Sequence, residues 1–288
     1  MSIPEDRLAL AEHYLEIAQP QRALDVLGRG DGLLEDGHYW ALRCAALIDL
    51  DRDRDAVSAA EAGLQLDPED TILLRLHARA AGNTGDLALA ERSLLSALAQ
   101  DSDQPQLLAE YAILLARGGQ VDKASRVLDE AERLDPLDGR VVSARGIIAY
   151  LRGDDSTTKK RAEQLLAHDP EARPGHLLRG AVLSSRGSAR AARRHYEAAA
   201  RLDPTDARVV EAAHAARRVA HPVLWPIYPV IRFGPMRTWL GFIVIAGIAF
   251  ATHITPLITV VIVGYLFMVV YSWTIAPLFV RHMRRRRG

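Results

Sequence analysis

The sequence repeats itself every 34 residues, and this period constrains the fold more than any other feature. Asp-Pro pairs recur at Asp67-Pro68, Asp135-Pro136, Asp169-Pro170 and Asp203-Pro204. Asp101 lies midway across the one double gap, and a second series follows the same period at Gly85, Gly119, Gly153 and Gly187. A fixed period of this length indicates an array in which each repeat is one supersecondary unit packed against its neighbours.

Within each repeat, small residues recur at fixed positions. If Pro68 is position 32, small residues occupy positions 8, 20 and 27, as in Ala112, Ala124 and Ala131, and larger apolar residues occupy position 24. Small residues let two helices approach closely, and the larger residue fills the space that remains. Glycine at position 15 allows the left-handed backbone that ends a first helix, and Asp-Pro ends the second. Each repeat is therefore predicted to be helix, turn, helix.

This pattern resembles the tetratricopeptide repeat, and Trp40 at position 4 agrees with it. The resemblance covers about residues 4–206, with an irregular first repeat and then five regular ones, which begin at Gly37, Thr71, Pro105, Gly139 and Arg173. In the fourth regular repeat Thr158 and Leu165 replace small residues, so different packing is expected there. The expected fold is all-α: a solenoid of five to six repeats over 1–206, a capping helix at 207–220 and a C-terminal transmembrane hairpin.

The hairpin is predicted from an uneven charge distribution. The chain has 36 basic and 36 acidic residues, but from Ala207 onward ten arginines face one acid, a charge of +9, which leaves −9 in residues 1–206. Residues 238–280 contain no Asp, Glu, Lys or Arg. As one helix they would span about 64 Å, twice the roughly 30 Å of a hydrocarbon core. His253 to Pro256 interrupt the run, so helices are expected near 238–252 and 256–280.

Arginines flank both ends of this hairpin, and the loop between its helices has none. The positive-inside rule therefore places both ends in the cytoplasm. Residues 221–237, rich in proline and aromatic residues, are predicted to be a juxtamembrane linker, and residues 281–288 a basic cytoplasmic tail. The acidic N-terminus offers no secretory signal, and the preference for arginine over lysine suggests a GC-rich genome. The expected location is a bacterial inner membrane.

The sequence gives little indication of catalysis. Phosphate-binding, dinucleotide, nucleophile-elbow and His-Glu-x-x-His motifs are missing, so we expect no enzyme activity, no cofactor, no metal and no small-molecule substrate. Cys44 occupies a position where the repeat needs a small buried residue. RNA binding, as in the related pentatricopeptide repeats, is disfavoured by the charge of −9. Nucleic acid is therefore not an expected partner.

The resemblance implies a partner-binding groove, because positions 2, 5, 9, 12 and 13 of the first helices line the concave face in that family. Across the repeats and the cap these positions include six arginines and two acids, Asp49 and Glu211. The groove is therefore predicted to hold an acidic or carboxylate-ending segment, and the alternative is an ordinary solvated face of an arginine-rich protein. The predicted groove residues are His38, Arg75, Arg79, Gln106, Ile113, Arg117, Arg140, Ile147 and Arg208.

The predicted function is a membrane-anchored, cytoplasm-facing scaffold or adaptor that binds a protein segment. The alternative is an assembly or transport subunit of a membrane complex, in which the hairpin packs with other membrane helices and Gly241, Gly247 and Ala251 permit close approach. An enzyme regulated by the solenoid is the least favoured interpretation, since few residues remain for a catalytic domain.

Overall fold

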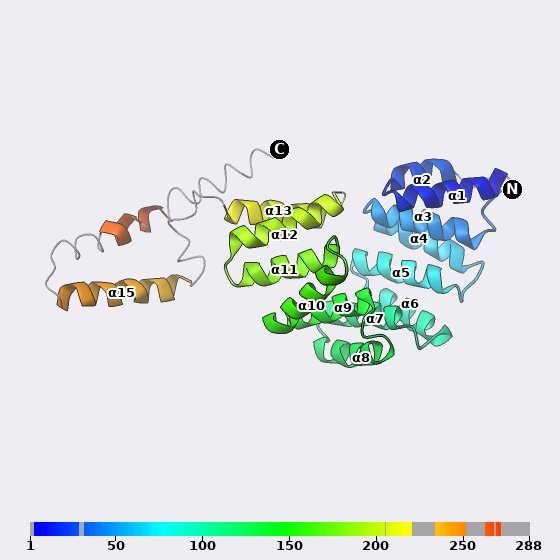
Figure 1. Ribbon diagram of the computed structural model, residues 1–288. Coiled ribbons are helices and arrows are strands. Elements are labelled where there is room, and N and C mark those ends of the chain that lie inside the picture. Colours follow the sequence, from blue (N-terminus) through cyan, green and yellow to red (C-terminus); the bar gives the residue numbers. More distant parts are fainter. Residues whose placement is uncertain are drawn as a thin grey trace. The chain divides into compact units, whose positions relative to one another are not determined.

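A computed structural model describes residues 3–28, 32–204, 206–220, 234–251, 263–267 and 269–271, and the elements found within these ranges are helices (Figure 1). The helices of the first half are α1 (Ile3–Glu16), α2 (Pro20–Leu27), α3 (Gly37–Asp49), α4 (Asp53–Leu64), α5 (Thr71–Thr84), α6 (Leu87–Gln100) and α7 (Pro105–Arg117). They are followed by α8 (Val121–Leu134), α9 (Gly139–Leu151), α10 (Asp155–His168), α11 (Arg173–Ser185), α12 (Ala189–Leu202), α13 (Ala207–Val219) and α15 (Pro235–Ala251).

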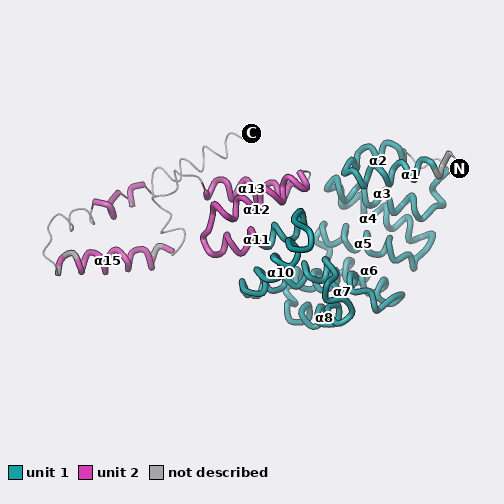
Figure 2. The backbone as a smooth tube through the Cα atoms, in the orientation of Figure 1, with its two compact units in different colours: residues 1–178 teal, residues 179–288 magenta. Residues whose placement is uncertain are grey.

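The chain divides into two compact units, residues 1–178 and residues 179–288, and the division falls inside α11 (Figure 2). In the first unit, consecutive helices pack in pairs. First helices of neighbouring repeats also lie side by side, as α1 with α3, α3 with α5 and α7 with α9. The first helices therefore form the inner layer of a solenoid, and the second helices form its outer layer.

The inner layer is not uniform. The Cα atoms of α5 and α7 approach each other less closely than those of α3 and α5 or of α7 and α9. Long side chains of the two helices, including Arg75 and Glu110, lie in the space between them. A groove therefore opens along the inner layer at α5 and α7.

The core contains the small residues that the period predicted. Ala90, Ala124 and Ala131 have no exposed surface, and Cys44 in α3 is equally buried. Gly63 lies in the last turn of α4, and a Cβ atom there would lie 2.7 Å from Leu73 Cδ1 of the next repeat and 2.8 Å from Trp40 Cβ of its own repeat. Side chains at these positions must be small because neighbouring helices already occupy the space.

The turns between helices confirm the predicted backbone geometry. Gly85, Gly119, Gly153 and Gly187 all have φ between +71° and +92°, the left-handed region that glycine adopts without steric cost. The aspartates of the Asp-Pro pairs accept backbone N–H groups in the following turn, for example Asp135 Oδ1 from the Leu137 nitrogen at 2.9 Å. Asp101 accepts in the same way from Asp103 at 3.2 Å, which explains why the aspartate persists where the proline is missing.

The fourth regular repeat forms a helix pair despite its two larger residues. Thr158 is fully buried, and its hydroxyl donates to the Asp154 carbonyl at 2.8 Å. Leu165 packs in a separate small cluster with Val142, Ala162 and Leu178. The two larger residues therefore leave the helix pair intact, and Leu165 packs in a small cluster formed by residues of α9, α10 and α11.

In the second unit, α12 and α13 pack together, and Asp206 caps α13 by accepting from the nitrogens of Arg208 and Val209. In α15 most of the described side chains are apolar and exposed, among them Trp239, Ile248 and Phe250. Phe242 in α15 contacts Tyr265 edge to face, with ring centroids 5.3 Å apart.

Among the described residues, no helix is both long enough and apolar enough to cross a membrane, and α15 has 17 residues. Of the second predicted membrane helix, residues 263–267 and 269–271 are described and helical. The rest of that segment, the linker at 221–233 and the tail at 281–288 lie outside the described residues.

Candidate interaction groove

The groove between α5 and α7 is a cavity of about 640 Å³ in the first unit, and we call it the inner groove. Its walls come from α5, α7, α9 and α11, with one residue from α6. Three kinds of side chain line it: five arginines, one acid and six apolar residues. The lining residues are Ile72, Arg75, Leu76, Ala78, Arg79, Leu94, Glu110, Ile113, Leu114, Arg117, Arg140 and Arg173.

Glu110 in α7 is the centre of the polar contacts in the inner groove. Arg75 from α5 donates to both carboxylate oxygens, through Nη2 to Oε1 at 2.7 Å and through Nε to Oε2 at 3.3 Å. Arg140 from α9 donates through Nη1 to Oε1 at 3.2 Å. The hydrogen bond to Glu110 raises the pKa of Arg75 above its usual value, so the guanidinium group of Arg75 stays charged. One carboxylate thereby joins three successive repeats.

Two further arginines of the inner groove, Arg117 and Arg79, have partners other than Glu110. Arg117 is exposed and donates through Nη2 to the Gly82 carbonyl of α5 at 2.7 Å. Arg79 Nη2 lies 3.9 Å from Asp49 Oδ1, and 63% of the Arg79 side chain is exposed. Five arginines against Glu110 give the lining residues a net charge of +4.

The structure brings five of the nine predicted groove residues together: Arg75, Arg79, Ile113, Arg117 and Arg140. The other four lie elsewhere. His38 is exposed at the start of α3, and Gln106 donates to Asp138 Oδ2 at 2.6 Å, which ties α7 to the N-terminal cap of α9. Ile147 is half-buried against the cluster around Leu165, and Arg208 belongs to the second unit.

Seven lining residues were not predicted from the sequence, among them Glu110, Ile72 and Arg173. Glu110 occupies repeat position 6 and Arg173 position 1, outside the five positions that the resemblance implies, while Ile72 occupies position 2. Glu110 lies 35 residues from Arg75 and 30 from Arg140, so no spacing within one repeat indicates the contact. The sequence held two signals: Ile72 lies at one of the five groove positions, and Glu110 is an acid one residue away from another.

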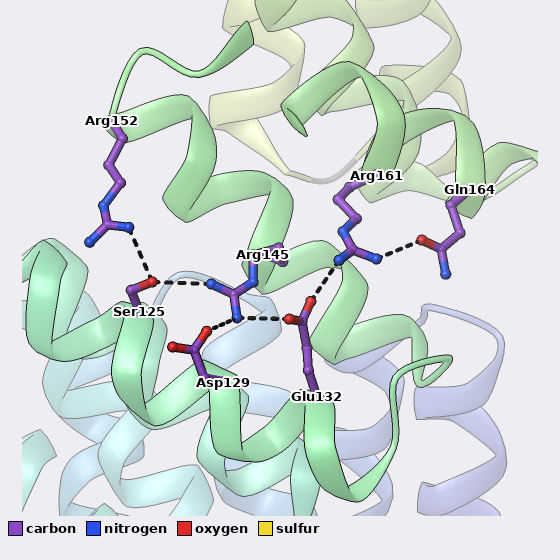
Figure 3. A network of polar contacts seen from close by, with 7 residues as sticks. All are labelled: Ser125, Asp129, Glu132, Arg145, Arg152, Arg161 and Gln164. Atoms are coloured by element: carbon purple, nitrogen blue, oxygen red, sulfur yellow. Dashed lines mark hydrogen bonds and ion pairs between the residues drawn. The ribbon is translucent and has the colours of Figure 1, made fainter. Parts of the chain in front are cut away.

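A second polar network joins α8, α9 and α10, and it has a structural role (Figure 3). Glu132 accepts from Arg145 Nη2 at 2.8 Å and from Arg161 Nη2 at 2.9 Å. Arg145 also donates to Asp129 and to Ser125 Oγ, and its side chain is 12% exposed. None of these residues lines the inner groove. The network fastens the fourth regular repeat to the third.

The Cys44 thiol and the possible metal ligands form no reactive site in the described part of the chain. Cys44 is buried, its Sγ lies 3.3 Å from the Ala56 carbonyl oxygen, and burial raises the pKa of its thiol to about 12. Such a thiol stays protonated at neutral pH and is a poor nucleophile. Across the described residues, no group of three or more His, Cys, Asp or Glu side chains is placed to hold a metal ion.

The paired helices, the inner layer and the inner groove define a helical-repeat protein. Residues 83–148 match the family model of the tetratricopeptide repeat. A TPR repeat-containing protein of Pseudomonas aeruginosa is 29% identical over 133 residues, which are 46% of this chain and 22% of that protein. The chain therefore matches about a fifth of the length of this curated relative.

Solved structures show the same fold. A thermophilic TPR protein of Thermus thermophilus has a TM-score of 0.55 at 21% identity, over 63% of this chain and 98% of its own. The APC/C hetero-tetramer Cut9–Hcn1 gives 0.56 at 15% identity, over 73% of this chain and 42% of its own. The described helices thus fold as an all-α helical-repeat solenoid, as the sequence predicted, and residues 83–148 match the tetratricopeptide repeat. Repeats of this kind mediate protein–protein interactions.

Proposed function

We propose that this chain is a membrane-attached scaffold that binds an acidic segment of another protein in the inner groove. The observation that carries the proposal is a local reversal of charge. Residues 1–178 contain 20 basic and 32 acidic residues, a net charge of −12, whereas the lining of the inner groove carries +4. An acidic segment is repelled by most of this unit and attracted by the groove, which favours a single binding register.

The contacts of the arginines support binding at this place. Arg79 and Arg140 have side chains that are 63% and 58% exposed, so a partner reaches them without rearranging the core. Guanidinium groups bind carboxylates through paired hydrogen bonds, which gives geometric selectivity in addition to attraction. The groove is therefore suited to the carboxylate side chains or the C-terminus of a peptide.

The test is binding of a fluorescent peptide of alternating glutamate and leucine to the full chain in a neutral detergent, followed by anisotropy. Replacing Arg79 and Arg140 together by glutamate should weaken binding by about tenfold or more, since each exposed contact contributes up to roughly 1 kcal/mol. Arg54→Glu with Arg126→Glu makes the same change of net charge at exposed residues outside the inner groove. Equal affinity of both double variants would exclude the groove as the binding site.

Membrane attachment is proposed from the segment 238–280. It contains no charged residue, and the exposed side chains of α15 include Trp239, Ile243 and Phe250, which water solvates poorly. The contact between Phe242 and Tyr265 brings two parts of this segment together, which favours a hairpin. Arginines on both flanks favour a location of the repeats and both termini on the cytoplasmic face of a bacterial inner membrane.

Topology reporters fused at Met1 and after Gly288 test this orientation. Both should report the cytoplasm. A reporter after Gly288 that is active in the periplasm, while the one at Met1 reports the cytoplasm, would refute the hairpin and leave a single span.

The alternative is an assembly or transport subunit whose hairpin packs against other membrane helices. Gly241 and Gly247 favour it, because a Cβ atom at either residue would meet nothing within 4 Å. Such glycines allow a second helix to approach closely. Co-purification separates the two functions: a partner of the groove should remain bound after deletion of residues 238–288, and a partner of the hairpin should be lost.

A further inference from the structure

One carboxylate of the protein itself already occupies part of the inner groove. Glu110 accepts three hydrogen bonds, two from Arg75 and one from Arg140, and it supplies the single negative charge among the described lining residues. Its side chain is 32% exposed and that of Arg75 is 29% exposed, so the contact is half-shielded from water. Partial shielding strengthens a charge-assisted pair relative to one on an open surface.

A partner carboxylate would need the same donors. The guanidinium of Arg75 makes its paired contact with Glu110, and Arg140 is bonded to Glu110 as well. To use Arg75 or Arg140, an incoming carboxylate must therefore replace Glu110 or share these donors with it. Arg79 and Arg117 do not contact Glu110 in the structure, and both are exposed.

We propose that Glu110 is a built-in competitor for the partner's carboxylates and thereby sets the specificity of the inner groove. The inference rests on the function proposed above. While Glu110 is bonded to Arg75 and Arg140, a segment with a single isolated acid can bind only arginines that do not contact Glu110, such as Arg79 and Arg117. A segment with several acids can bind Arg79 and Arg117 first and then compete with Glu110 for the remaining donors.

The apolar part of the lining defines the partner further. Ile72 is 58% exposed, and Leu76 and Ile113 are half-buried beside the arginines. A cavity of about 640 Å³ has the size of typical binding pockets for small molecules or several peptide side chains. The partner is therefore an acidic segment that also carries large apolar side chains, because such side chains would cover Ile72 and its neighbours.

Glu110→Gln tests the proposal in the full chain, with the alternating glutamate–leucine peptide as the probe. The amide has nearly the shape of the carboxylate but no charge, so Arg75 and Arg140 become available. We expect the peptide to bind about tenfold tighter or more, as one released charged contact permits. The affinity should also fall more steeply with salt, because two more cations take part.

Two further variants serve as controls. Glu91→Gln removes one acid that accepts from Tyr111 at 2.8 Å and from Lys123 at 3.4 Å and does not line the inner groove, so it should leave affinity unchanged. Glu110→Ala also removes the amide oxygen with which glutamine could still accept from Arg75 or Arg140. This variant should therefore bind the peptide at least as tightly as Glu110→Gln. Thermal unfolding of each variant establishes that it is folded.

The outcomes separate this proposal from the proposed function. If the wild type binds the peptide and Glu110→Gln binds it equally or more weakly, Glu110 serves to position the arginines, and the competitor proposal is refuted while the groove stands. If neither folded protein binds the peptide, the groove function and the competitor proposal both fail. A gain for a lysine–leucine peptide in Glu110→Gln would also refute the proposal, since selectivity must move toward acidic segments.

Discussion

Replacing Glu132 by glutamine should destabilise the first unit measurably, because this carboxylate joins three helices. Glu132 in α8 accepts from Arg145 in α9 and from Arg161 in α10, and its side chain is 22% exposed (Figure 3). Hydrogen bonds to charged groups contribute about 1.5 to 3 kcal/mol each. Glutamine keeps one acceptor oxygen, and Asp129 continues to balance Arg145, so the net loss should be about 2 kcal/mol.

The assay is thermal unfolding of the full chain followed by far-UV circular dichroism. For a unit of this size each kcal/mol lowers Tm by about 2–4 °C, so Glu132→Gln should lower it by about 4–8 °C. Glu130→Gln is the matched control on the same helix, since Glu130 pairs with Arg133 on the surface, and its Tm should equal that of the wild type. The double variant with Arg161→Gln should lose less than the sum of the single losses, because the two side chains share a contact. An unchanged Tm for Glu132→Gln would refute the structural role of the network.

Three further predictions concern the repeat itself. Ala124→Trp should cost about 1 to 3 kcal/mol or more of the free energy of unfolding, because Ala124 is fully buried between helices. Urea titration measures this loss, and an unchanged unfolding midpoint would show that the predicted register of the second helices is wrong. Gly119→Ala should cost about 1 kcal/mol of the free energy of unfolding because its φ is +79°; a Cβ atom there meets no neighbour, so the cost comes from the backbone conformation alone. Gly139→Ala at the start of α9 should be neutral or stabilising, and equal effects of the two substitutions would contradict the conformational explanation. Burial lowers the pKa of His77 below its ordinary 6.5. The unfolded state then binds the proton more readily, so the contribution of neutral His77 to the free energy of unfolding is fully present above pH 6.5 and declines as pH falls from there toward the folded pKa. If the free energies of unfolding of the wild type and of His77→Gln change equally with pH across this range, the linkage is disproved.

Features that act within one repeat could be predicted from the amino-acid sequence. The first helices begin at Gly37, Thr71 and the three later starts that the period indicates, and the glycines of position 15 have left-handed backbones. These features follow from local rules, since a turn needs positive φ and a close helix pair needs small side chains wherever they occur. The same period also marks helix starts: α3, α5, α9 and α13 are capped by aspartates spaced by multiples of 34 residues, which are Asp36, Asp70, Asp138 and Asp206.

The contacts between repeats could not be predicted from the sequence, because they depend on three-dimensional packing. The same holds for the set of residues that lines the inner groove. The period assigns a residue to a helix face, but the opening between α5 and α7 depends on how successive repeats pack, which no single repeat specifies. Whether Arg75 faces solvent or Glu110 depends on side chains 35 residues apart. Ile147 packs against a small cluster that includes Leu165, whose position is small in the other regular repeats. Long arginine side chains reach across several repeat positions, so their partners follow from the three-dimensional spacing of helices rather than from sequence spacing.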